Sequence, residues 1–597
     1  MGAIRLPGTL ITLGADAYTL PRLRRRITRS LAVLLPFAFL AAFLAVHGHT
    51  ASTGVVEIEQ ATTRRPAHTP VAQAEAVDAQ QQPQTVNGAM SQQPRAQWSK
   101  EDRQLRKYQW VAPEAHGSLN RRVEELSPDQ QRVRDWLLRS RVESTGGTGI
   151  GLGATDPPQP IRPAVAGQKH AGQATEDEGP GLFVDGSYDK YSDLVREWQT
   201  GRPPTVCEKG DWEDTFAELQ ANMLRGKREP RLLEFMCRDG EYCGGFADRI
   251  LGMVSTFLYS ILTNRAFSMT WEQPAPLDLL FDSPFIDWSR PFRNSTTPVG
   301  LLYSNTTLLE QSEEINAHNW EEKKIDDFFP RFVAEYGSKD STPWLQLDFN
   351  RGVVIRSFSY PPIKPHLDRL GLKLESAYSC LLNYLLRPKP AVLAFIAQYT
   401  SMFALPEYFV VGLQVRTGDN AMWASRKDAI NTVSYHSQYF RCAAQVAATY
   451  AAPSQKVLYY LITDSHALEQ DALAMYPDQV VVTGLKQAHI EIKTDHSEGM
   501  KAVKRAADGF MRTVAESWIF AATDFQILTY RSGFGKIPTW LRGRPNTTIQ
   551  LFNPHTDPEY TKMVKKKHKG KLPKEVDCSS PEALKSFSEM AQDWSLG

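Results

Sequence analysis

A basic side chain follows a strongly apolar segment in the last third of this 597-residue chain. Residues 408–415 read YFVVGLQV, which predicts a buried strand, and Arg416 stands directly after its end. A guanidinium at the carboxyl end of a buried strand can bind a diphosphate, because its N–H donors form a rigid fork that matches phosphate oxygens. The alternative is a surface ion pair with Asp419, and the spacing alone does not decide between these two interpretations.

Two further predicted strands end in polar residues that suit a nucleotide. Residues 457–463 are followed by Asp464 and Ser465, which could hold a base or a ribose hydroxyl, although a cap on the next helix is the favoured interpretation. Residues 525–529 are followed by the turn 530–535 (YRSGFG). Its backbone amides and its hydroxyl group could cradle phosphate oxygens, although a plain turn has the same composition.

A glycine-bearing loop precedes the most apolar predicted helix, residues 250–262. The loop reads CGGFADR from Cys243 to Arg249, and a loop that enters a helix N-terminus can bind an anion through its backbone N–H groups. It lacks the lysine and the spacing of a Walker loop, and one pair of adjacent glycines does not make a dinucleotide fingerprint. The loop is therefore a candidate anion site of another type.

The segments between these groups alternate between strand and helix, which predicts a parallel α/β sheet. Because ligands of such sheets bind outside the carboxyl ends of the strands, three polar groups at strand ends of one sheet predict a nucleotide site. The predicted elements are the helix 250–262, the strands 266–271 and 353–355, the helix 381–399 with interruptions at Pro388 and Pro390, the strands 408–415, 457–463, 479–482 and 525–529, and the helices 467–475 and 513–522.

Taken in order, these motifs resemble those of the GDP-fucose-using fucosyltransferases of the GT-B fold. That group includes the N-glycan core α1,6 enzymes, bacterial nodulation enzymes, plant xyloglucan α1,2 enzymes and protein O-fucosyltransferases. The likeness covers about residues 237–545. Its segments are the glycine loop with its helix and strand (244–271), YLLRPKP (384–390), QVRTGD (414–419), YLITD (460–464), and the acidic helix, strand and turn of 516–535.

The resemblance implies two Rossmann-like α/β domains that face a cleft, with residues 185–400 on the acceptor side and residues 401–560 binding the nucleotide. It implies an inverting transfer of L-fucose from GDP-fucose to a glycan or glycoprotein, with Arg416 as the catalytic residue. Donor binding is expected from Gly245, Asp248, Arg249, Gln414, Arg416, Asp464, Ser532, Gly533 and Phe534.

The chain departs from the family pattern at several positions. Thr417 replaces the second arginine of the animal-type pair, so one phosphate or catalytic contact is expected to be missing. Gln414 replaces the leading histidine, as in the plant-like members. Ala247 and Asp248 stand where glycine and asparagine are usual. A carboxylate beside a diphosphate would repel it unless Asp248 faces fucose hydroxyls or Arg249.

No D-x-D motif stands at a predicted strand end. We therefore expect a metal-independent reaction that uses no cofactor, in which fixed cations and amide donors stabilise the leaving GDP. The general base for the acceptor hydroxyl is not identified by the sequence. Charge alone makes Asp248, Asp419, Glu491 and Asp495 candidates, and such acids are more often solvated surface groups.

An apolar segment near the N-terminus, residues 31–47, predicts a membrane anchor. Five arginines lie between residues 22 and 29, whereas no lysine or arginine follows the segment until Arg64, so residues 1–30 are expected in the cytosol. A cleaved signal peptide is the alternative. We expect a single-pass type II Golgi membrane protein with a lumenal catalytic domain, in agreement with sequons at Asn294, Asn305 and Asn546.

Residues 48–184 are expected to form a largely flexible stem, because much of this segment is rich in Ala, Gln, Thr, Pro and Gly. The apolar spacing at 119–142 predicts a helix that Pro128 breaks near its start. It could be a lone surface helix or a coiled coil that joins a homodimer. Residues 561–597 are expected to form a basic tail, and for its basic run at 562–571 a solvated state is favoured over docking to acidic glycans.

The composition sets further limits. The chain has 68 basic and 67 acidic residues, so its net charge of +1 gives no general attraction to nucleic acid. The six cysteines form no paired C-x-x-C array, and their even number suits disulfides in the lumen. Cys237 and Cys243 are close enough in the sequence to close a small loop. Rival classes are a transferase for another nucleotide sugar, a non-catalytic glycan-binding relative, and an adhesion protein, which lacks support because repeated short strands are missing.

Overall fold

The computed structural model describes ten stretches of the chain, all between residues 110 and 592. The predicted anchor and the sequons at Asn294 and Asn305 lie outside them. Within the described stretches, no helix is long and apolar enough to cross a membrane. The stretches are residues 110–111, 113–143, 212–237, 243–271, 275–288, 312–337, 340–418, 431–486, 500–553 and 575–592.

Four parallel strands form the first sheet, in the order β2-β1-β5-β4. The helix α7 leads from β1 to β2 and is buried on nearly every side, as its apolar sequence predicts. Gly252 permits this close packing, because a Cβ atom there would lie 1.8 Å from the carbonyl oxygen of Phe349. The elements are α6 (Trp212–Leu224), β1 (Leu232–Cys237), α7 (Phe246–Leu262), β2 (Ala266–Trp271), β4 (Glu313–Asn316), α10 (Glu322–Tyr336) and β5 (Trp344–Asp348).

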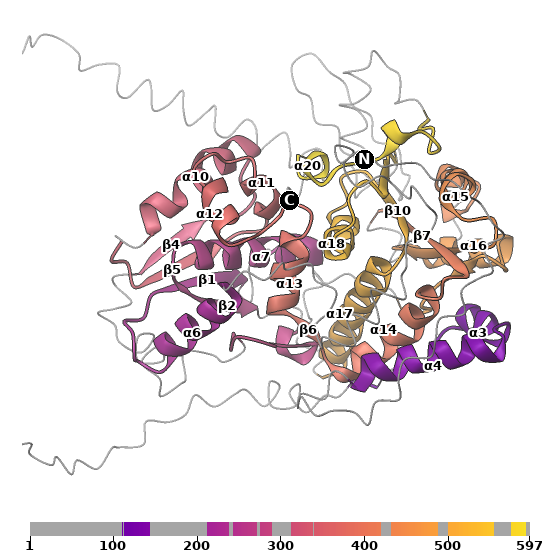
Figure 1. Cartoon of the computed structure of the whole chain (residues 1–597), viewed down its shortest axis with the longest axis horizontal. Coiled ribbons are helices and arrows are strands. Elements are labelled where there is room, and N and C mark those ends of the chain that lie inside the picture. Colours follow the sequence, from indigo (N-terminus) through magenta and orange to yellow (C-terminus); the bar gives the residue numbers. More distant parts are fainter. Residues whose placement is uncertain are drawn as a thin grey trace, which may run out of the picture. The chain divides into compact units, whose positions relative to one another are not determined.

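Five parallel strands form the second sheet, in the order β11-β10-β7-β8-β9. The chain runs outward from β7 through β8 to β9 and then returns to β10 on the other side of β7, so the strand order reverses between β7 and β10. Figure 1 shows the connecting helices around these strands. The elements are β7 (Tyr408–Val415), α15 (Ser437–Tyr450), β8 (Lys456–Thr463), α16 (His466–Met475), β9 (Val480–Val481), α17 (Met500–Ala521), β10 (Phe525–Thr529), α18 (Gly533–Arg542) and β11 (Thr548–Leu551).

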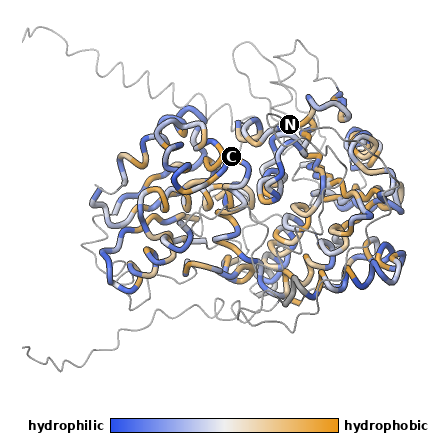
Figure 2. The backbone as a smooth tube through the Cα atoms, in the orientation of Figure 1, coloured by the Kyte–Doolittle hydropathy of each residue, from blue (hydrophilic) through white to orange (hydrophobic). Residues whose placement is uncertain are grey.

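The chain passes between the sheets through α13 (Ala377–Leu385), β6 (Arg387–Pro388) and α14 (Pro390–Phe403), and β6 pairs with β3 (Phe281–Asp282). One apolar core includes buried residues of both halves. Trp271 of β2 stacks on Phe510 of α17 with ring centroids 5.8 Å apart. The hydrophobic stretches of these strands and helices are orange in Figure 2. The two sheets are therefore joined by packed aromatic side chains.

The structure confirms most of the predicted elements, but the helix predicted at 513–522 begins at Met500 as part of α17, and one predicted strand is absent. Strands were predicted at 266–271, 408–415 and 525–529, and β2, β7 and β10 have these bounds. The strand predicted at 353–355 is wrong, because α11 (Val354–Ser357) is a helical turn there. Val353, Val354 and Ile355 are all buried, and a short buried apolar run does not distinguish strand from helix.

The segment that the sequence assigns to the stem contains two helices that pack on the second half of the fold. α3 (Gly117–Glu124) contacts β9, and α4 (Pro128–Glu143) packs along α14. Pro128 is the first residue of α4, which confirms the predicted break. The Val482 N–H donates to Ser118 Oγ at 3.3 Å, and the His116 N–H donates to the Tyr399 hydroxyl at 3.1 Å. Residues 113–143 are thus part of the folded body.

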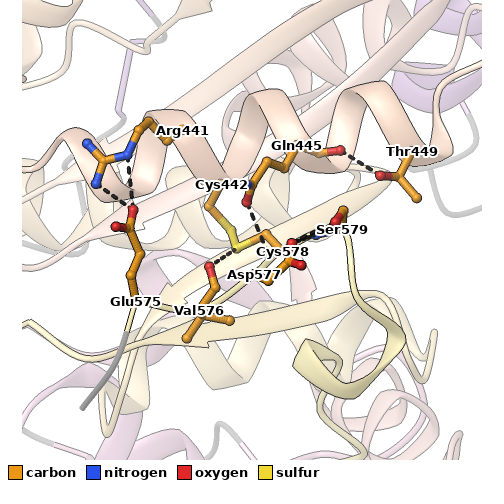
Figure 3. Close-up of a disulfide and its surroundings, with 9 residues drawn as sticks. All are labelled: Arg441, Cys442, Gln445, Thr449, Glu575, Val576, Asp577, Cys578 and Ser579. Carbon is orange, nitrogen blue, oxygen red and sulfur yellow. Dashed lines mark hydrogen bonds and ion pairs between the residues drawn. A yellow bond between two sulfur atoms is a disulfide. The ribbon is translucent and has the colours of Figure 1, made fainter.

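The end of the chain is also packed. A disulfide joins Cys578 to Cys442 of α15, and beside it Glu575 pairs with Arg441 (Figure 3). The short helix α20 (Phe587–Met590) then reaches α11, where Arg356 donates to the carbonyl oxygen of Ala591 at 3.0 Å. Residues 575–592 of the predicted tail are therefore packed on the folded body, whereas the basic run at 562–571, for which a solvated state was expected, lies outside the described residues. The predicted disulfide between Cys237 and Cys243 is confirmed.

Candidate functional site

Arg416 follows β7 at the point where the strand order of the second sheet reverses. Its backbone N–H donates to Thr529 Oγ1 at 3.0 Å, and its carbonyl oxygen accepts from Asn553 Nδ2 at 2.8 Å. The side chain is 29% exposed, and Nη1 lies 3.9 Å from Asp464 Oδ2. In parallel α/β sheets this position is where ligands bind. Asp419, the other partner considered for Arg416, lies outside the described residues.

Asp464 shapes the loop that carries Arg416. Its Oδ1 accepts from the N–H of Thr417 at 2.6 Å and from the Thr417 hydroxyl at 2.9 Å, while Oδ2 accepts from the N–H of Gly418 at 2.9 Å. Gly418 has a φ of 112°, which a glycine adopts without strain. Ser465 caps α16 by accepting from the N–H of Leu468 at 3.2 Å. The carboxylate thus holds the loop, and the cap expected after β8 is present.

Gln414 is a residue of β7, pairs with Leu528 of β10 and is 4% exposed. Its Oε1 accepts from the N–H of Thr529 at 3.1 Å. A Cβ atom on Gly535 would lie 3.0 Å from the same oxygen, so the start of α18 packs closely against this amide. Gln414 therefore positions neighbouring backbone, although the resemblance implies that it binds the donor.

The turn after β10 delivers a helix N-terminus to the same edge of the sheet. Arg531 has a φ of 63°, Ser532 is the N-cap residue, and α18 begins at Gly533. The first N–H groups of a helix have no intrahelical partner, and they stand at the positive end of its dipole. The N–H groups of Gly533 and Phe534 are in this position. Such a terminus binds phosphate or another anion.

The glycine loop before α7 is closed by contacts within itself. Asp248 Oδ2 accepts from the N–H of Gly245 at 3.2 Å, which makes Asp248 part of a capping box. The Arg249 side chain is 1% exposed, its Nε donates to the carbonyl oxygen of Gly244 at 2.9 Å, and its guanidinium lies 5.6 Å from the centroid of Trp271. These contacts position the loop, which is also tied by the disulfide of Cys243.

This loop lies close to the helix that follows β10. The ring of Phe246, the first residue of α7, is 6.4 Å from the ring of Phe534 in the first turn of α18. The structure thus brings the predicted residues of the glycine loop to the N-terminal end of α18, which α7 contacts. The N-termini of two helices from different halves of the fold meet there.

Sequence analysis did not identify two polar residues that complete this network, Tyr439 and Asn553. Tyr439 is fully enclosed, its hydroxyl lies 2.8 Å from Thr529 Oγ1, and burial raises the pKa of this hydroxyl. Asn553 follows the last strand of the sheet and is 4% exposed. The only signal in the sequence is a polar residue directly after a short apolar segment, which is too common to indicate a site.

A buried charge cluster lies between α16 and α17. Arg512 Nη2 is 2.8 Å from Glu516 Oε1 and 3.8 Å from Glu469 Oε2, and the Thr483 hydroxyl donates to Glu516 at 2.7 Å. Burial raises the pKa of Glu469 from 4.5 to about 7, an effect that Arg512 opposes and Glu516 reinforces. All four side chains are buried, so this cluster holds the two helices together.

The remaining predicted residues are placed as follows. Asn546 is exposed with a φ of 55°, at the start of the segment that leads into β11. Of the candidate bases, Asp248 caps α7, whereas Asp419, Glu491 and Asp495 lie outside the described residues. In the part of the chain that the structure describes, no three acidic, histidine or cysteine side chains are grouped as metal ligands.

Comparison with known proteins found no matching protein-family model and no matching curated sequence. Among solved structures, FUT1 of Arabidopsis thaliana, as a mutant in complex with GDP, is 16% identical, with 64% of this chain and 88% of that chain covered at a TM-score of 0.42. The fucosyltransferase NodZ from Bradyrhizobium is 15% identical, with 52% and 92% covered at a TM-score of 0.32. NodZ co-crystallised with GDP gives a TM-score of 0.33. The chain is similar to these fucosyltransferases, and a likeness at this level assigns no substrate to it.

Proposed function

We propose that this protein is a glycosyltransferase that moves L-fucose from GDP-fucose to a glycan or glycoprotein. The observation that carries the proposal is the juxtaposition of Arg416 and the N-terminus of α18 at the strand reversal of the second sheet. A guanidinium and a helix N-terminus are two of the groups that bind a diphosphate best. The ordered motifs of the sequence supply the choice of fucose and of guanosine as the nucleoside.

The reaction proposed is an inverting displacement. An acceptor hydroxyl attacks the anomeric carbon of fucose, the bond from that carbon to the β-phosphate oxygen breaks, and GDP leaves with the electron pair. Negative charge then grows on the β-phosphate. Arg416 and the N–H groups of Gly533 and Phe534 stabilise it, so that no metal ion or cofactor is required. The proton of the acceptor passes to a base that the described residues do not identify.

The cationic part of the proposed site differs from that of animal-type relatives next to Arg416. Thr417 occupies the position of the second arginine of animal-type relatives, and both its N–H and its hydroxyl donate to Asp464. Arg416 therefore acts as a single guanidinium on the diphosphate. The Asp464 carboxylate lies 3.9 Å from Nη1 and orients that guanidinium. In this proposal it does not bind the guanine base of the donor.

The proposed location is the Golgi membrane, with one N-terminal helix as the anchor, a type II orientation and a lumenal catalytic body. Disulfides at Cys237–Cys243 and Cys442–Cys578 suit an oxidising compartment. The exposed Asn546 suits glycosylation in the same compartment. The proposed partners are GDP-fucose, a glycan acceptor and the membrane, without nucleic acid, and with a homodimer through the stem as a further proposal.

The test is a transfer assay with the full chain in detergent. Labelled GDP-sugars and UDP-sugars are offered with a glycan array, and we expect label only from GDP-fucose on a subset of glycans. Transfer from another nucleotide sugar alone would replace fucose in the proposal.

A non-catalytic glycan-binding relative is the second candidate, because Asp248 and Arg249 make the contacts within their own loop that hold it closed. Stabilisation of the chain by GDP without transfer or hydrolysis of GDP-fucose would favour this candidate.

A further inference from the structure

Both polar groups of the Arg416 peptide backbone are held by side chains rather than by strand pairing. The pairing of β7 with β10 ends at Gln414 and Leu528, so Arg416 lies beyond the last pair of hydrogen-bonded strand residues. Thr529 Oγ1 accepts from the Arg416 N–H at 3.0 Å and donates to the Gln414 carbonyl at 3.0 Å. The Arg416 carbonyl oxygen accepts from Asn553 Nδ2 at 2.8 Å.

Asn553 reaches this carbonyl from the edge of the sheet. It follows β11, which pairs with β10 and not with β7, so its side chain crosses the end of β10 to contact a residue 137 positions earlier. The Asn553 side chain also interacts with the Tyr439 hydroxyl, which lies 2.8 Å from Thr529 Oγ1. Thr529, Asn553 and Tyr439 thus form a polar network around the backbone of Arg416.

We propose that Asn553 is a positioning residue that fixes the direction in which Arg416 presents its guanidinium to the donor diphosphate. The proposal rests on the proposed function. A hydrogen bond to one carbonyl contributes only modestly to folding. It matters more for catalysis, because a guanidinium that stabilises charge at the β-phosphate must be held within a fraction of an ångström.

The sharpest perturbation is Asn553→Asp. The carboxylate keeps the size of the amide, but when ionised it has no hydrogen to donate and it places a negative oxygen against the Arg416 carbonyl. We expect kcat to fall about 10- to 100-fold, the loss associated with a displaced catalytic group. Asn553→Ala is the second variant, for use if Asn553→Asp fails to fold. It removes the donor without adding charge and is expected to lower kcat about tenfold.

Gln220→Glu is the matched control. Gln220 is 1% exposed in α6, and its Nε2 donates to the Phe267 carbonyl oxygen at 2.8 Å, the same distance as the bond from Asn553. The substitution also converts an amide to a carboxylate, but in the first half of the fold. We expect a comparable decrease in melting temperature and no comparable decrease in kcat, because Gln220 shares no partner with Arg416.

A double-mutant cycle with Arg416→Ala separates positioning from a general effect on the fold. If Asn553 acts through Arg416, Asn553→Asp changes the residual rate of the Arg416→Ala chain by less than about twofold, because residues that act as a unit are not additive. An equal loss in both backgrounds, or unchanged kcat in folded Asn553→Asp and Asn553→Ala, would overturn the inference alone. A wild-type chain that neither binds GDP nor transfers fucose would overturn the proposed function and this inference together.

Discussion

Glu469 makes the stability of the protein depend on pH in a way that one substitution should remove. Its carboxyl group is 3% exposed and lies between α16 and α17, where Arg512 is 3.8 Å away on one side and Glu516 adds a second negative charge. Burial raises the pKa of this group from 4.5 to about 7. The folded chain therefore binds a proton more tightly than the unfolded chain does.

The sign follows from proton linkage. The stabilisation that protonated Glu469 provides is fully present below about pH 4.5 and is lost as the pH rises through about 7. A shift from 4.5 to about 7 corresponds to a loss on the order of 3 kcal/mol across this window, at about 1.4 kcal/mol per pH unit. Glu469→Gln carries no titrating group, so its free energy of unfolding should lack this contribution.

The assay is urea unfolding of wild type and Glu469→Gln at pH 5, 6, 7 and 8 in one ionic strength. We expect the two free energies of unfolding to diverge as the pH rises, with the variant gaining on wild type by roughly 2–3 kcal/mol between pH 5 and pH 8. Glu375→Gln, at an exposed carboxylate, is the control and should follow wild type. Parallel profiles for wild type and Glu469→Gln would refute the assignment of a raised pKa to this buried acid.

Two further predictions concern the site loop and the N-terminal helices. Asp464→Asn should lower kcat about tenfold while the fold persists. An amide nitrogen cannot accept from the Gly418 N–H, so the loop that carries Arg416 loses its shape. Unchanged kinetics would show that the loop does not need this carboxylate. A fragment of residues 180–597 should melt well below one of residues 92–597, because it lacks α3 and α4. These helices bury Leu119, Trp136 and Leu137, and burial of each side chain contributes about 1.5–3 kcal/mol. Equal melting temperatures would show that the two helices do not stabilise the fold.

The second sheet could largely be predicted from the sequence, because its strands are apolar runs that end at polar residues. In the first sheet only β2 was predicted, and β1, β4 and β5 were not. β1 reads LLEFMC, and Glu234 in its middle argues against a buried strand unless its partners are known. These partners come from β2 and β5: the Thr270 hydroxyl donates to Glu234 at 2.6 Å and Trp344 Nε1 at 2.9 Å. A buried carboxylate whose hydrogen bonds come from distant strands has no local signal.

The candidate site shows the same division. The position of Arg416 directly after β7 could be predicted, because strand, residue and turn are adjacent in the sequence. The hydrogen bond from Asn553 to the Arg416 carbonyl oxygen could not be predicted, because Asn553 follows another strand, 137 residues away. Asp248 could have been recognised as a cap, since an acid three residues after the N-cap position is a local pattern. The prediction that Asp248 contacts the donor came from the resemblance. A resemblance can suggest the role of a residue, but it does not show where the side chain points.

The most direct test of the account is the rate of fucose transfer by Arg416→Ala. Loss of the Arg416 guanidinium at the proposed donor site should lower kcat by about 10²–10³, the cost of removing a charge-stabilising donor, while the melting temperature stays close to that of wild type. Arg441→Ala, which removes an exposed guanidinium paired with Glu575, is the control and should keep its activity. A folded Arg416→Ala chain that retains most of its transferase activity would contradict the assignment of the donor site.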